Sequence, residues 1–153
     1  MGIKQKKNQL KISQKVVSAR EKCSADKETI VFSFRHMTTC DDYNFYCFDK
    51  HKKNSETSNA IATLTDKLSE LSEMTWDEFF SKGRRNGGPD PIFVSQMDSK
   101  FINKINIPLS GDERLIAVRF NSQKSRFILK RGTKCGRVAH ILGIDYNLTL
   151  YKH

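Results

Sequence analysis

The C-terminal part of the chain, Leu115–Lys152, reads LIAVRFNSQKSRFILKRGTKCGRVAHILGIDYNLTLYK. It combines the clearest apolar–polar alternation in the sequence with dense positive charge, and it predicts three or four short antiparallel strands. The expected turns are Asn121–Ser125, the glycine-containing Gly132–Gly136, and Asp145–Asn147. The run Val138–Ile144 is almost wholly apolar, which is typical of a central strand covered on both faces.

Two aromatic runs nearer the N-terminus predict further strands. Glu28–Met37 contains the alternating segment TIVFSFRHM, and Arg35 and His36 lie at the end of the expected strand. Tyr43–Phe48 is a second aromatic run, separated from the first by a turn-forming segment. We therefore expect the two runs to pair as a hairpin.

Two helices are expected next. Ser55–Met74 carries one apolar stripe at helical spacing, and Thr75 with Glu78 predicts a capping box that opens a second helix, ending at Gly83. The stripe consists of Ile61, Leu64, Leu68 and Leu71, and the expected buried face of the second helix consists of Trp76, Phe79 and Phe80. The glycines and prolines of Arg84–Pro91 exclude regular structure there. A short strand at Ile92–Val94 and a helical turn at Ser99–Ile105 complete the pattern.

This order of elements predicts an α+β domain, with two helices packed on an antiparallel sheet and a C-terminal meander of three to four strands. The 153 residues fit one domain, 28–153. The preceding residues 1–27 are polar and basic, and we expect them to form a flexible arm.

The charge is positive and uneven, with a net value of +10. Residues 1–22 hold seven Lys and Arg against one Glu, and residues 100–153 hold eleven against three acidic residues. This asymmetry favours an anionic partner, with RNA preferred over DNA, although surplus lysine also serves solubility alone. No apolar run is long enough to span a bilayer and no signal-peptide pattern is present, so no membrane partner and a cytoplasmic location are expected.

The four cysteines, Cys23, Cys40, Cys47 and Cys135, form no CxxC pair, and the four histidines are scattered. We therefore expect free thiols, no metal site and no cofactor. The GxSxG, Walker A and HExxH motifs are all absent.

Three segments carry a resemblance to a known group of proteins: FSFRHM at Phe32–Met37, LSELSEMTWDEF at Leu68–Phe79, and RVAHILGIDYNLTLY at Arg137–Tyr151. Together they resemble a family of small uncharacterised proteins encoded on prophages, plasmids and other mobile elements, over residues 28–152. That family often has a histidine before the proline that follows the second helix, where this chain has Asp90 before Pro91. The C-terminal sheet is more loosely similar to the RelE/ParE toxins, whose arginines and lysines hold mRNA or a protein target.

The candidate site residues come mainly from the C-terminal strands. The candidates for catalysis are His140, Lys130 and Arg131, as base, acid and charge-stabilising groups at a reacting phosphate. The candidates for nucleic-acid binding are Arg84, Arg85, Arg119, Arg126, Arg137 and Tyr151. His36 is a candidate comparable to His140, and both histidines are also compatible with a purely structural role.

Two functions are compatible with these residues. The first is a toxin-like or host-interfering protein of a mobile element that acts on RNA, as a metal-independent ribonuclease. The alternative is a non-enzymatic module that holds nucleic acid through the arm and the sheet, or blocks a host protein through the aromatic surface around Trp76 and Phe80. An antitoxin is a further candidate partner. The loop Gly83–Pro91 fits either a ligand-binding loop, in which glycines allow close approach, or a plain connector.

Overall fold

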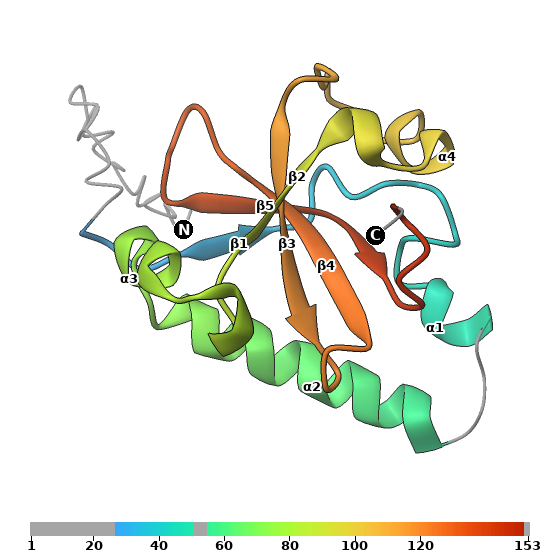
Figure 1. The fold of residues 1–153 in the computed structure, drawn as a ribbon, viewed down its shortest axis with the longest axis horizontal. Helices are drawn as coiled ribbons and strands as arrows, with labels where there is room; N and C mark the ends of the chain where they lie inside the picture. Colours follow the sequence, from blue (N-terminus) through green and yellow to red (C-terminus); the bar gives the residue numbers. More distant parts are fainter. Residues whose placement is uncertain (1–26, 51–54, 152–153) are drawn as a thin grey trace, which may run out of the picture.

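The computed structural model describes residues 27–50 and 55–151, so nearly all of the predicted basic arm lies outside the described residues. Five strands form one sheet in the order β1–β5–β4–β3–β2 (Figure 1). Their bounds are β1 Val31–Ser33, β2 Asp90–Phe93, β3 Arg114–Phe120, β4 Ser125–Arg131 and β5 Val138–Asp145. The helices are α1 Cys47–Lys50, α2 Ser55–Ser72, α3 Trp76–Ser81 and α4 Ser99–Ile102, with 3-10 turns η1 Arg84–Asn86 and η2 Val94–Gln96. The α+β class is confirmed.

The sheet is mixed, so the expectation of an antiparallel sheet is wrong at one edge. β2, β3, β4 and β5 pair antiparallel in sequence, whereas β1 pairs parallel with β5. A parallel pair needs a long connection, and here nearly the whole domain lies between the two strands. β5 therefore becomes an interior strand of the sheet, as its apolar sequence predicted.

Both faces of the sheet are covered by apolar side chains. One core packs α2 and α3 against the face that carries Val118, Phe127 and Ala139. The other packs α4 and the surrounding loops against the face that carries Ile128 and Leu142. Figure 1 shows α2 and α3 on one side of the sheet and α4 on the other. No helix of the described residues is long and apolar enough to cross a membrane.

The two predicted helices form with small changes in their buried faces. Thr75 caps α3 through the expected capping box: its hydroxyl accepts from the Glu78 amide, and the Glu78 carboxylate accepts from the Thr75 amide. In α2 the buried stripe includes Ala60, and Ile61 is exposed. Phe80 was expected to be buried but is 46% exposed, stacked against the buried Trp76 ring.

The predicted hairpin between Glu28–Met37 and Tyr43–Phe48 is wrong. β1 has only three residues, and the second run forms turns and the start of α1. β1 pairs with β5 instead, at the edge of the sheet. Tyr43 instead turns inward, and its carbonyl accepts a hydrogen bond of 2.7 Å from the Ile144 amide.

The segment Arg84–Pro91 is more regular than expected. It begins as η1, and its last two residues open β2, which pairs with β3 alone. Pro91 is tolerated there because an edge strand has one side without a hydrogen-bonding partner. α4 is shorter than the helical turn expected at Ser99–Ile105.

Gly143 of β5 lies in close contact with α4 and with the loop that carries Tyr43. A methyl group at this position would overlap the Phe101 ring and lie 2.8 Å from the Tyr43 carbonyl oxygen. We expect Gly143→Ala to lower the free energy of unfolding by about 1–3 kcal/mol, because the α4 side of the core must move to make room. Gly111→Ala is the matched control, since its nearest new neighbour would be 3.7 Å away. Urea unfolding measures both, and equal effects would contradict the close packing of α4 on β5.

Candidate functional site

His36 and His140 meet at one end of the sheet. The parallel register pairs Ser33 of β1 with His140 of β5, and the turn that follows β1 then brings His36 back toward it. The two ring centroids are 4.9 Å apart, with the rings at 65°. On the other side of β5, the register with β4 pairs His140 with Lys130. Three elements thus bring three titratable side chains together.

The orientation of His36 is set by a single hydrogen bond. Its Nδ1 lies 2.9 Å from the Oδ1 atom of Asn106, and this amide oxygen can only accept. Nδ1 therefore carries a proton and donates, which leaves Nε2 of His36 as the atom available to a ligand.

His140 is half-buried, and its pKa is lowered. Burial is the largest cause, and the nearby charges of His36, Arg35 and Lys130 act in the same direction. The neutral imidazole is therefore the favoured form at neutral pH. Its Nε2 faces the turn at Gly132, since a Cβ added there would lie 3.4 Å from that atom. Such a group is suited to accept a proton.

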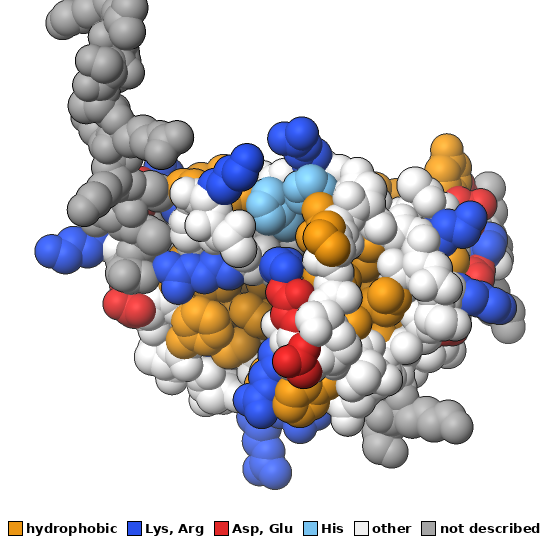
Figure 2. Space-filling view, turned by 90° about the horizontal axis from the view of Figure 1, so that it is seen from above, with side chains coloured by type: hydrophobic (Ala, Val, Ile, Leu, Met, Phe, Trp, Pro, Cys, Tyr) orange, Lys and Arg blue, Asp and Glu red, His pale blue; other side chains and the backbone are white. Residues whose placement is uncertain are grey.

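These side chains open into a cavity of about 230 Å³. It is lined by His36, Ile107, Pro108, Lys130, Arg131, Gly132, Thr133 and His140. Lys130 forms an ion pair with Glu113, which holds the ammonium group at the lining. In Figure 2 the two histidines of the described residues form a continuous surface, with basic and acidic side chains beside them.

Arg131 also lines this cavity, but its guanidinium group packs against α3, so its expected catalytic role stays a prediction. It lies 5.2 Å from the centre of the Trp76 ring, and Nε donates a 2.7 Å hydrogen bond to the Gly136 carbonyl. Adjacent residues of a strand point to opposite faces, so Lys130 and Arg131 separate. His36 is the third titratable side chain at this site. Arg35 is exposed, and its charge contributes to the lowered pKa of His140.

Three other expected binding residues contact groups of the protein itself. Arg126 is 1% exposed, lies 4.5 Å from the centre of the Tyr151 ring, and pairs across the strands with Asp145. Burial raises the pKa of Tyr151 to about 12, so its hydroxyl stays neutral. Arg137 donates to the Thr29 carbonyl and to the Glu28 carboxylate, both at 2.8 Å. The single basic patch expected on the C-terminal strands is therefore wrong.

The remaining three arginines do come together, at the other end of the sheet. Arg84, Arg85 and Arg119 line a cavity of about 240 Å³ with Gln123. The carboxylate of Asp90 lies 3.0 Å from Arg84 and 3.9 Å from Arg119, and it holds both guanidinium groups in place. Arg85 is exposed and has no ion pair with a described residue.

Backbone conformation and packing explain why glycines occur beside this cluster. Gly87 has φ +79°, in the left-handed region, and a side chain on Gly88 would overlap the Lys82 carbonyl group. The chain's own packing therefore requires both glycines, which favours the connector interpretation for Gly87 and Gly88.

Comparison of the chain with family models, with curated proteins and with solved structures finds no match. Both resemblances seen in the sequence therefore stay predictions. Among the described residues, no group of three or more His, Cys, Asp or Glu side chains is placed to hold a metal ion. Cys40 and Cys47 are free thiols.

The environment of His140 predicts a pH dependence of stability. Because folding lowers its pKa from the ordinary 6.5, the unfolded chain binds this proton more readily than the folded chain does. The stability that His140 contributes is therefore present above pH 6.5 and is lost as the pH falls through the folded-state pKa. Urea unfolding at pH 7.5 and pH 5.0 should show a smaller loss for His140→Gln than for the unaltered protein. An equal loss would contradict the lowered pKa.

Proposed function

We propose that the protein cleaves RNA at the cavity of His36 and His140, by attack of the ribose 2′-hydroxyl on the adjacent phosphate. The observation that carries this proposal is the pair of histidine rings 4.9 Å apart beside Lys130, at the wall of an open cavity. Cleavage of this kind needs a proton acceptor, a proton donor and positive charge near the phosphate.

The two histidines take the two proton-transfer roles of such a reaction. His140, with its lowered pKa, is the base that takes the proton of the 2′-hydroxyl while the 2′-oxygen bonds to phosphorus. His36, held by Asn106 through Nδ1, gives a proton from Nε2 to the 5′-oxygen as the phosphorus–oxygen bond breaks. The products are a 2′,3′-cyclic phosphate and a 5′-hydroxyl end, so atoms and protons balance.

Positive charge close to this site comes from Lys130 and Arg35. Lys130 lines the cavity, and the charge of Arg35 reaches His140. The ion pair with Glu113 fixes Lys130 and also neutralises part of its charge. The overall net charge of +10 favours approach of a polyanion and makes that approach sensitive to salt.

The direct test is cleavage of a fluorescently labelled single-stranded RNA in the presence of EDTA. We expect His36→Ala and His140→Ala each to reduce the rate by about 10²–10⁴-fold, the usual contribution of a positioned proton-transfer group. Asn106→Ala should reduce the cleavage rate by a smaller factor, because Asn106 only orients His36. Lys104→Ala, which changes an exposed side chain outside the cavity lining, is the control. Full activity in both histidine variants, or loss of cleavage in EDTA, would overturn the proposal.

We further propose that this activity belongs to a toxin-like or host-interfering protein of a mobile element, and that it acts in the cytoplasm. Its support is the resemblance of the three segments described above together with the basic charge. Induced expression in bacteria should then arrest growth, and His140→Ala should relieve the arrest while the melting temperature stays within a few degrees. Unimpaired growth at high expression would contradict a toxin.

A second candidate function, binding of a protein partner, rests on a different surface. Phe34 and Phe45 are both exposed, and their ring centroids lie 5.6 Å apart, next to the exposed Tyr46. Exposed aromatic clusters are common in protein interfaces. In the aromatic surface expected from the sequence, Trp76 is fully buried but Phe80 is 46% exposed, so a host protein could contact either surface.

A further inference from the structure

One side of α2 is lined by polar residues that face the β3–β4 connection. Glu56, Asn59, Thr63 and Lys67 follow one another at spacings of three and four residues, which places them on one side of the helix. The buried residues Ala60, Leu64 and Leu71 lie on another side. α2 therefore presents an apolar face to the core and a polar face to the loop that joins β3 to β4.

That loop has an unusual backbone. Asn121, Ser122 and Gln123 have φ angles of 52°, 51° and 69°, so three consecutive non-glycine residues are left-handed. Residues other than glycine rarely adopt this backbone conformation. It is held by a hydrogen bond of 3.0 Å from the Lys124 amide to the Asn121 carbonyl, and by one of 3.3 Å from Arg119 to the Gln123 side chain. The loop thus fixes three polar side chains where glycine would be easier to accommodate.

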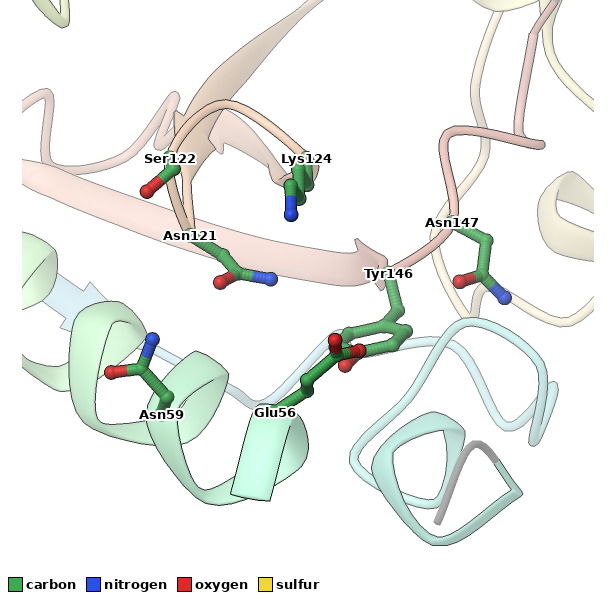
Figure 3. A pocket seen from close by; sticks show the side chains of 7 residues that line it. All are labelled: Glu56, Asn59, Asn121, Ser122, Lys124, Tyr146 and Asn147. Carbon is green, nitrogen blue, oxygen red and sulfur yellow. The ribbon is translucent and has the colours of Figure 1, made fainter. Parts of the chain in front are cut away.

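Cavities lie on both sides of the loop. The first, of about 300 Å³, is lined by Glu56, Asn59, Asn121, Ser122, Lys124, Tyr146 and Asn147. Figure 3 shows these side chains arranged around it, from α2, the loop and the segment after β5. The second, of about 280 Å³, shares Asn121 and Ser122 with the first and reaches Thr63 and Lys67. It also shares Arg84, Arg119 and Gln123 with the arginine cavity, so the three cavities are neighbours, and we call this row of cavities the groove.

The two ends of this groove differ in charge. At the first end Glu56 and Lys124 balance, and amide and hydroxyl groups supply most of the remaining polar lining. At the other end three guanidinium groups face one carboxylate, Asp90. The groove therefore offers hydrogen-bonding groups of both kinds at one end and an excess of positive charge at the other.

We propose that this groove binds a nucleotide unit, with its phosphate at Arg84, Arg85 and Arg119 and its base at Asn59 and Asn121. Guanidinium groups match phosphate oxygens in geometry and charge, whereas side-chain amides donate and accept, as the edges of bases do. Asp90 is a positioning residue, because it holds Arg84 and Arg119 ready without contacting the phosphate. The source of the nucleotide is a strand of RNA or a free mononucleotide.

This groove is separate from the histidine cavity and stands on its own observations. The β3–β4 loop and Lys130 lie at opposite ends of β4, about 20 Å apart at the usual rise of a strand. If the nucleotide belongs to RNA that is cleaved at the histidines, which rests on the function proposed above, the groove anchors the strand several nucleotides from the reacting bond.

The experiment measures binding of 5′-AMP, adenosine, inorganic phosphate and a hexa-adenylate to the full chain by calorimetry, with His140→Ala as the host so that RNA stays intact. We expect 5′-AMP to bind at least tenfold more tightly than adenosine or phosphate. Tighter binding of the hexa-adenylate than of 5′-AMP assigns the groove to RNA, and equal affinity assigns it to a free nucleotide. Binding of 5′-AMP no tighter than that of phosphate would overturn the proposal.

Two sets of variants locate the binding. Arg84→Glu with Arg85→Glu should weaken 5′-AMP and phosphate at least tenfold, and Asn59→Leu should weaken 5′-AMP while leaving phosphate unchanged. Lys100→Glu with Lys104→Glu removes the same charge from exposed positions on and after α4 and should leave 5′-AMP within twofold. Arg85→Glu alone disturbs no ion pair of the described residues. It replaces the double variant in the binding measurement if the double variant unfolds. Equal losses in the two double variants would show that net charge alone binds the nucleotide, and would overturn the groove without affecting the histidines.

Discussion

The pairing of β5 with β1 on one side and β4 on the other is the constraint on which both the fold and the histidine site depend. β5 is buried on both faces, so a shift of one residue would move Ala139 and Leu142 into the wrong cores. The register is therefore fixed by packing, and it places His140 between Ser33 and Lys130. The ring contact with His36 follows from the same pairing, because β1 ends three residues before His36. β5 therefore contributes to both hydrophobic cores and also carries His140 of the candidate site.

The same sheet places the basic side chains of its strands on two opposite faces. Strand alternation sends Arg131 to the α3 side and Lys130 to the α4 side, and acidic partners then fix several cations: Glu28 holds Arg137 and Glu113 holds Lys130. Arg126 is buried over Tyr151, next to Asp145 in the adjoining strand. Leaving a buried cation without such partners is costly, so these contacts offset the cost of burying Arg126. Within residues 27–50 and 55–151, cationic side chains line both the histidine cavity and the arginine groove.

Much of the fold could be predicted from local patterns, and the candidate site only in part. The α3 capping box and the strands of Leu115–Lys152 depend on short-range spacing, which a sequence displays directly. The partner of β1 could not be predicted, because a parallel pairing between Val31–Ser33 and β5 leaves no local signal. Without it, His36 and His140 remain two separate histidines. Likewise Asp90 next to Pro91 gives no sign that its carboxylate will hold Arg84 and Arg119, since their approach depends on the pairing of β2 with β3.

In the proposed reaction the ribose 2′-hydroxyl attacks the phosphate, and His140 and His36 transfer the protons. The chemical ends of the RNA fragments test it most directly, because they record which oxygen attacked the phosphate. Mass spectrometry of fragments from a short RNA should find 2′,3′-cyclic phosphate and 5′-hydroxyl ends, and the same RNA with a 2′-deoxyribose at the cleaved position should stay intact there. Fragments with 3′-hydroxyl and 5′-phosphate ends, or cleavage at the deoxy position, would contradict the account.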